Sequence, residues 1–238
     1  MYENTKISLT KWFLATYILT VHSKGISSLQ LASMINVTQR TAWHLTHRIR
    51  EMLKDNDPVV LIGIVEVDET YVGGSLKNMH AKKKKSMKGM DNKTMVFGAL
   101  KRDGKLRTRV ITNTALENLT GTLEEFVAHD SSLMSDESNA YTKIGEKYNH
   151  KTVNHREKEY VRKEAKVSVH TNSIEGYWNI LKKQIDGIHH FVSPKHLQRY
   201  CNESAFRYNN RKTFQDEKFA YALSNCNGTL PYKTLIGK

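Results

Sequence analysis

The sequence predicts an α/β fold with a mixed sheet, preceded by an all-helical module. Apolar residues recur at helical spacing from residue 9 to residue 53. Beyond a turn-rich break at residues 54–58, KDNDP, the pattern changes to β-branched runs that are typical of strands. Strand-like and helix-like segments then alternate, as expected of an α/β domain. We therefore predict a helical module in residues 1–57, an α/β domain in residues 58–212 and a C-terminal tail in residues 213–238.

Two closely spaced helices are predicted within the helical module. Ser27 or Ser28 can cap a helix over residues 29–34, and a tight turn then leads to Thr38, which can cap a longer helix. The residues predicted to face inward are Leu29, Ala32, Ile35, Ala42, Leu45, Ile49 and Leu53.

The second of these helices carries polar residues on its other side, namely Gln39, Arg40, His44, His47 and Arg48. A short helix, a short turn and a longer helix with basic residues near its start are typical of a helix-turn-helix that reads DNA. Two packed helices with a solvated face give a similar pattern, so a purely structural pair is the alternative. We favour the DNA-binding interpretation.

The α/β domain begins with a nearly continuous β-branched run at residues 59–74, which predicts a strand buried on both faces. Two further strands follow, joined by a hairpin turn centred on Asp103 and Gly104. An amphipathic helix comes next, with Leu119, Leu123 and Phe126 facing inward. The remaining predicted elements are short strands within residues 131–138 and 151–155 and helices over residues 173–185 and 194–208.

Net charge is the informative part of the composition. The 238 residues include 37 Lys and Arg against 24 Asp and Glu, which gives a formal charge of +13. A field of this sign attracts polyanions, so we expect DNA or RNA as the partner. The two cysteines, Cys201 and Cys226, exclude a Cys-based zinc site by number. No apolar run has the length of a membrane-spanning helix, and we expect a cytoplasmic, nucleoid-associated protein.

Acidic residues occur in this basic chain at positions that call for an explanation. Glu66 and Asp68 lie within an apolar strand, on one face because side chains alternate along a strand. Burying such charges is costly unless something pairs them. Asp136 closes a second strand and Glu175 opens a helix. Each acid alone is explained by a turn, a cap or the helix dipole, but together they can converge at one edge of the sheet.

Converging carboxylates repel one another unless a divalent cation neutralises them. Oxygen ligands without His or Cys favour Mg²⁺ or Mn²⁺, and a pair of such ions suits in-line phosphoryl displacement. In this interpretation Asp68 bridges two ions, while Asp136 and Glu175 hold one each. Lys182 lies two helical turns beyond Glu175, on the same face, where it can hold a phosphate.

Several segments resemble the insertion-sequence transposases of the DDE class, specifically the ISXO group: VEVDETYVGG, SDESNAY, VHTNSIEGYWNILKKQIDGIHHFVSPKHLQRY and FRYNNR. The resemblance covers about residues 9–212 and implies an RNase H-like catalytic domain with Mg²⁺-dependent cleavage at the element's ends. It also implies that the freed 3′-OH is joined to target DNA. By position, the first two catalytic acids are Asp68 and Asp136, and the third is Glu175 or Asn172. We favour Glu175, because an anion binds Mg²⁺ better than an amide does.

The resemblance also bears on DNA binding and assembly. It implies double-stranded DNA as the partner, held by a homodimer or a larger assembly. Members of the group usually carry a Cys-rich zinc ribbon before the helical module, which this sequence lacks, so either the start is truncated or the helix-turn-helix alone recognises the ends. The further residues predicted to contact DNA are Lys83, Lys84, Lys182, Arg199 and Arg207. The alternative functions are a hydrolytic RNase H-like nuclease and a DNA-binding regulator derived from a transposase.

Overall fold

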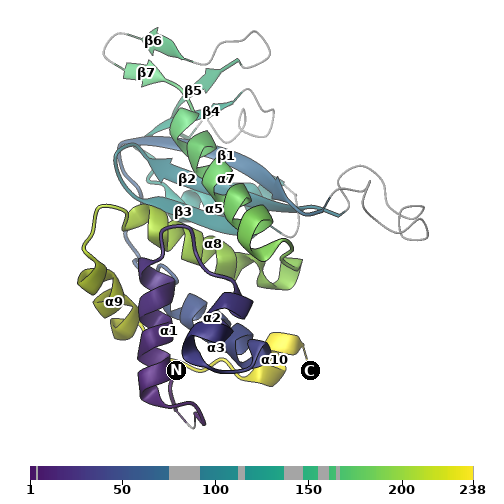
Figure 1. The fold of residues 1–238 in the computed structure, drawn as a ribbon. Helices are drawn as coiled ribbons and strands as arrows, with labels where there is room; N and C mark the ends of the chain where they lie inside the picture. The colour runs from purple at the N-terminus through teal and green to yellow at the C-terminus, as the bar shows by residue number, and fades with distance from the viewer. Residues whose placement is uncertain are drawn as a thin grey trace, which may run out of the picture. The chain divides into compact units, whose positions relative to one another are not determined.

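The computed structural model describes residues 1–3, 5–74, 92–111, 116–136, 147–154, 161–164 and 167–237. The chain forms two compact units, and each unit is built from segments that are separated in the sequence (Figure 1). The helical unit comprises residues 1–56, 183–190 and 199–238. The sheet unit comprises residues 57–182 and 191–198.

The sheet unit is organised around five strands in the order β3-β2-β1-β4-β5. Their bounds are β1 Ile64–Val72, β2 Thr94–Lys101, β3 Leu106–Ile111, β4 Ser132–Asp136 and β5 Asn149–Val153. The pairs β1–β2 and β2–β3 are antiparallel, whereas β1–β4 and β4–β5 are parallel. The predicted hairpin between β2 and β3 is present, and Asp103 has a φ of 55° in its turn. The sheet is therefore mixed, as predicted.

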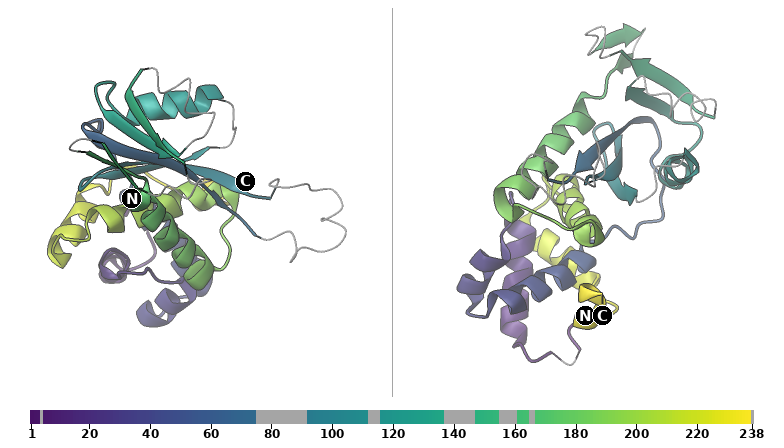
Figure 2. Two further views of the ribbon diagram at one scale, coloured as in Figure 1. Left: turned by 90° about the horizontal axis from the view of Figure 1, so that it is seen from above. Right: turned by 90° about the vertical axis from the view of Figure 1, so that its right-hand side faces the viewer.

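Helices cover both faces of this sheet. Helix α5, Leu116–Phe126, lies on one face and α7, Asn172–Gln184, lies on the other (Figure 2). On the α5 side, Val65 and Val67 of β1 join a core that includes the predicted Leu119, Leu123 and Phe126. Because side chains alternate between the two faces of a strand, Glu66 and Asp68 of β1 belong to the α7 face. A mixed five-stranded sheet flanked by helices confirms the predicted RNase H-like α/β class.

The chain beyond β5 contains further short elements. Strands β6, Arg162–Glu164, and β7, Val167–Val169, form a separate antiparallel pair. Helix α7 continues into a π-helical turn at Ile185–His189, and α8 spans Pro194–Asn209. The sequence pattern predicted α7 and α8 but neither strand of the small pair.

The helical unit contains α1, Leu9–Val21, α2, Ser28–Ile35, and α3, Gln39–Met52. The cap of α2 is Ser27, whose hydroxyl accepts a hydrogen bond from the Gln30 backbone in a capping box. Thr38 caps α3 as predicted. Residues 213–238 contain α9, Gln215–Ser224, and α10, Tyr232–Ile236.

Two of the residues predicted for the faces of α2 and α3 are placed differently in the structure. Leu29 is 69% exposed, so its predicted inward orientation is wrong. The buried residues of α2 are Leu31, Ala32 and Ile35 instead. His47, predicted on the outer side of α3, is fully buried, with its ring against Trp43.

Within the described residues, no helix combines the length and the apolar character needed to cross a membrane.

Candidate active site

Two strand acids come together at one end of the parallel pair β1–β4. The register of β1 and β4 ends with the pair Glu66–Met134, and Asp68 of β1 and Asp136, the last residue of β4, each lie two residues beyond this pair. The negative charge of Asp136 acts on the Asp68 carboxyl. The structure therefore brings the first two predicted acids together, from neighbouring strands and on the α7 face of the sheet.

The surroundings of Asp68 disfavour its charged form. Burial and, to a smaller extent, the negative charges of Glu69 and Asp136 raise the pKa of Asp68 to about 7. Hydrogen bonds from the Glu69 backbone and from the Trp178 indole act in the opposite direction without offsetting burial. A cation beside this carboxylate would relieve the cost of ionising it.

Helix α7 contacts the acid pair through Trp178. The indole Nε1 donates a hydrogen bond of 2.9 Å to Oδ2 of Asp68. The ring fits there because Gly98, the β2 residue paired with Asp68, has no side chain. A Cβ at position 98 would lie 2.7 Å from Cη2 and Cζ2 of Trp178 and 3.1 Å from Cδ1 of Ile174. Gly98 is thus what allows the indole to reach the carboxylate.

The remaining predicted site residues lie along α7. Glu175 is half-buried, and its Oε1 accepts a hydrogen bond of 2.8 Å from Oγ1 of Thr171. Asn172 and Lys182 are exposed. Among the described residues, no three His, Cys, Asp or Glu side chains are close enough to hold a metal ion. Glu175 therefore does not join Asp68 and Asp136 in one such group.

Sequence reasoning singled out Glu66 only as an acid in an apolar strand, and the structure gives it a place in this region. Glu66 is fully buried and forms a salt bridge of 3.0 Å with Arg102. Its other oxygen accepts hydrogen bonds from the backbone of Ser173 and Ile174, in the first turn of α7. The signal in the sequence was the two-residue spacing of Glu66 and Asp68, which places both on the face that α7 covers.

Asp68 and Asp136 are suited to a divalent cation by their chemistry. Both offer carboxylate oxygens, which Mg²⁺ and Mn²⁺ prefer. Asp68 is half-buried and its pKa is raised, so a cation beside it would stabilise its charged form.

Comparison with known proteins gives a family. Residues 60–209, from just before β1 to the end of α8, match the model of the ISXO2-like transposase domain. This chain belongs to the ISXO2-like transposase family. A search of curated protein sequences finds no match. Among solved structures, a chain of the Drosophila P element transposase strand transfer complex is similar, with 10% identity and a TM-score of 0.28. The similarity covers 99% of this chain and 63% of the P element chain.

Outside the matched ISXO2-like domain, the residues predicted to read DNA from α3 make contacts within the helical unit. Gln39 and Arg40 are exposed. Arg40 donates a hydrogen bond of 2.9 Å from Nε to the Tyr232 hydroxyl of α10. His44 lies 3.3 Å from the Leu230 carbonyl oxygen, and burial lowers the pKa of its imidazole. The C-terminal segment therefore occupies part of the helix surface that the sequence assigned to DNA.

The other predicted DNA contacts differ in their surroundings. Arg48 stacks over the ring of Trp12, with Cζ 4.9 Å from the centroid. Arg199 forms a salt bridge of 2.9 Å with Glu51. The Arg207 side chain is 9% exposed and pairs with the fully buried Glu203. Lys83 and Lys84 lie outside the described residues.

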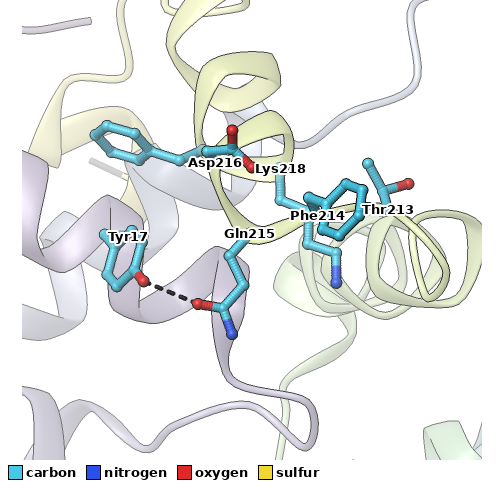
Figure 3. Close-up of a pocket in the computed structure, with 7 residues that line it drawn as sticks. Tyr17, Thr213, Phe214, Gln215, Asp216 and Lys218 are labelled. Atoms are coloured by element: carbon cyan, nitrogen blue, oxygen red, sulfur yellow. Dashed lines mark hydrogen bonds between the residues drawn. The ribbon is translucent and has the colours of Figure 1, made fainter.

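A pocket lies in the helical unit between α1 and the start of α9 (Figure 3). Tyr17 of α1 donates a hydrogen bond of 3.0 Å to Oε1 of Gln215 at its edge. The other lining residues are Thr213, Phe214, Asp216, Lys218 and Phe219. None of the predicted site residues lines it.

Proposed function

We propose that this protein is a DNA transposase that cleaves phosphodiester bonds at the ends of a mobile element and joins the freed 3′-OH to target DNA. Asp68 and Asp136 are its first two catalytic acids. The observation that carries the proposal is their placement on neighbouring parallel strands, each two residues beyond the last β1–β4 pair and close enough for the charge of Asp136 to act on Asp68, whose pKa is raised to about 7, mainly by burial. Membership of the ISXO2-like transposase family supports it.

Asp68 and Asp136 would hold Mg²⁺ or Mn²⁺, with two ions in the complete site. When bound, such ions activate the attacking oxygen and stabilise the leaving oxygen of the phosphodiester. We assign the third carboxylate to Glu175, which lies one helical turn before Trp178 on α7, the residue that touches Asp68. Asn172, the first residue of α7, is the alternative third member.

Double-stranded DNA is the proposed partner, bound by a homodimer or a larger assembly. The pair α2–α3 supports a helix-turn-helix, because Gln39 and Arg40 are exposed in the first turn of α3, where such modules read base edges. Lys182 is exposed near the end of α7 and is assigned to a phosphate. The net charge of +13 favours DNA binding of this kind.

The test compares Asp68→Asn and Asp136→Asn with wild type in cleavage of end-containing DNA and in strand transfer from pre-cut ends. We expect both variants to lose both activities while DNA binding persists. The matched control is Asp103→Asn, the same change in the exposed β2–β3 turn, where Asn tolerates the positive φ. If wild type cleaves DNA but never joins pre-cut ends, the protein is a hydrolytic nuclease. If it binds DNA but neither cleaves it nor binds Mn²⁺, it is a regulator.

A further inference from the structure

Glu66 is bound to the start of α7 by three hydrogen bonds. Its Oε2 accepts from the backbone N–H groups of Ser173, at 2.9 Å, and Ile174, at 3.1 Å. Its Oε1 accepts from the Ser173 hydroxyl at 3.1 Å. The first N–H groups of a helix have no partner within the helix, and a negative charge there is favourable. A carboxylate from β1 thus caps α7.

The segment that leads into α7 is held by the same cluster. Arg102 pairs with Oε1 of Glu66 and also donates to the backbone oxygens of Ser168, at 2.8 Å, and His170, at 3.3 Å. The ring atom Nδ1 of His170 lies 3.2 Å from Oε1 of Glu66. The buried charge of Glu66 is therefore paired, and its partners fix both the last residues before α7 and its first turn.

The same two elements meet again at the acid pair. Asp68 lies two residues beyond Glu66 on β1 and accepts the indole hydrogen bond of Trp178, one helical turn beyond Ile174 on α7. Strand β1 and helix α7 are thus joined at two points, one at Glu66 and one at Asp68. Glu66 fixes where α7 starts, and this start determines where Trp178 and Glu175 lie relative to Asp68.

We propose that Glu66 is a positioning residue of the carboxylate site: it anchors the start of α7 on β1, thereby holds Trp178 against Asp68 and sets where Glu175 lies along the helix. This inference rests on the proposed function for its catalytic consequence. The anchoring itself is independent of that function. Loss of residues that orient metal-site ligands typically lowers metal affinity or activity about 10- to 100-fold, and we expect an effect of this size for Glu66.

The experiment uses the full chain labelled with 5-fluorotryptophan and followed by ¹⁹F NMR. The chain has three tryptophans, Trp12, Trp43 and Trp178, and Trp178→Phe assigns the signal of the third. Glu66→Gln keeps the volume but presents an amide where the carboxylate accepts hydrogen bonds. Ser173→Ala removes a single bond and leaves the buried charge paired. Wild type and each variant are measured with and without Mn²⁺, whose paramagnetism broadens signals near its binding site.

The matched control is Glu203→Gln in the helical unit. Glu203 is fully buried and paired with two arginines, Arg50 and Arg207. Glu203→Gln therefore also removes a buried carboxylate that is paired with arginine. It does so in the helical unit, where we expect no effect on the Trp178 signal.

We expect Glu66→Gln to shift the Trp178 signal and to slow cleavage about 10- to 100-fold, whereas Glu203→Gln leaves that signal in place. Ser173→Ala should shift the signal in the same direction by less, and it carries the test if Glu66→Gln does not fold. An unchanged Trp178 signal in folded Glu66→Gln overturns the inference. If Glu66→Gln does not fold, an unchanged Trp178 signal in Ser173→Ala overturns it. If Mn²⁺ leaves the wild-type Trp178 signal sharp, the proposed metal site fails, while the signal shift still decides the role of Glu66.

Discussion

At the scale of single residues, the burial of Asp68 has a consequence for stability. Its pKa is raised from 3.8 to about 7, mainly by burial, so the folded protein holds a proton that the unfolded chain releases at lower pH. The contribution of Asp68 to the free energy of unfolding is therefore greatest below about pH 4, and this contribution is lost as the pH rises to about 7. A shift of this size corresponds to an upper bound on the order of 4 kcal/mol.

Asp68→Asn removes this ionisation. In the absence of divalent ions we expect the variant to be more stable than wild type at pH 8 and to differ little from it at pH 4. Urea unfolding in EDTA at the two pH values measures the difference. Adding Mg²⁺ at pH 8 should stabilise wild type and not the variant, because the cation offsets the cost of the buried charge. Equal pH dependence in the two proteins would contradict the burial argument.

Gly98 controls the distance between the Trp178 indole and Asp68. Gly98→Ala places a methyl group 2.7 Å from the indole, so the ring must move and its hydrogen bond to Asp68 weakens. We expect a loss of about 1–3 kcal/mol in stability and slower DNA cleavage. Urea unfolding and single-turnover cleavage measure the two effects.

The control for this substitution is Gly176→Ala on α7, where the added methyl group meets nothing within 4 Å apart from adjoining residues and the backbone of its own helix. Alanine in a helix is favoured over glycine by about 0.5–1 kcal/mol, so this variant should gain stability and cleave DNA normally. Normal cleavage by Gly98→Ala would show that the indole contact has no catalytic importance.

At the scale of elements, the contact between α10 and α3 bears on the DNA binding proposed for α3. The Tyr232 hydroxyl accepts a hydrogen bond from Arg40, and the Arg40 guanidinium also lies over the Tyr232 ring, 4.9 Å from its centroid. Tyr232→Phe removes the hydroxyl and keeps the ring. Since a hydrogen bond contributes about 0.5–1.5 kcal/mol, we expect DNA affinity to rise about 2- to 10-fold when this bond no longer holds Arg40.

Fluorescence anisotropy with a labelled duplex measures this affinity, and Arg40→Ala should lower it in either background. A lower affinity of Tyr232→Phe would mean instead that the hydroxyl holds Arg40 in the conformation that binds DNA.

Local sequence patterns predicted most helices and strands, because the residues that determine each element lie close together along the chain. The caps at Thr38 and Ser27 and the apolar spacing of α3 and α5 depend on neighbours along the chain. The pairing of Glu66 with the first turn of α7 joins residues 107 positions apart, and no local pattern encodes it. Likewise, the sequence placed Asp68 within one strand and Asp136 at the end of another, whereas their proximity depends on the parallel register of β1 and β4.

At the scale of the whole molecule, the discontinuity of the helical unit matters for how it folds. Its core joins residues of α1, α2 and α3 to Phe206, Ala222, Leu230 and Leu235 from the far end of the sequence. It also contains Arg50, which is 1% exposed and pairs with Glu203. Burial raises the pKa of Glu203, but Arg207 and Arg50 outweigh this effect and hold it at about 2. The first 56 residues thus depend on the last forty for apolar contacts and for a counter-charge.

A fragment of residues 1–56 should therefore fail to fold by itself. Each large apolar side chain that is lost from a core removes about 1.5–3 kcal/mol, which for three of them is comparable with the whole stability of a small domain. In addition, an Arg50 side chain that is buried without its partner Glu203 destabilises the folded state. A fusion of residues 1–56 to 199–238 through a Gly/Ser linker restores both, and the 2.9 Å salt bridge of Arg199 with Glu51 sets the start of the second segment beside the last turn of α3. Circular dichroism during thermal unfolding should show a cooperative transition for the fusion only, and a cooperative transition in the isolated fragment would mean that α1, α2 and α3 are stable without the C-terminal segment.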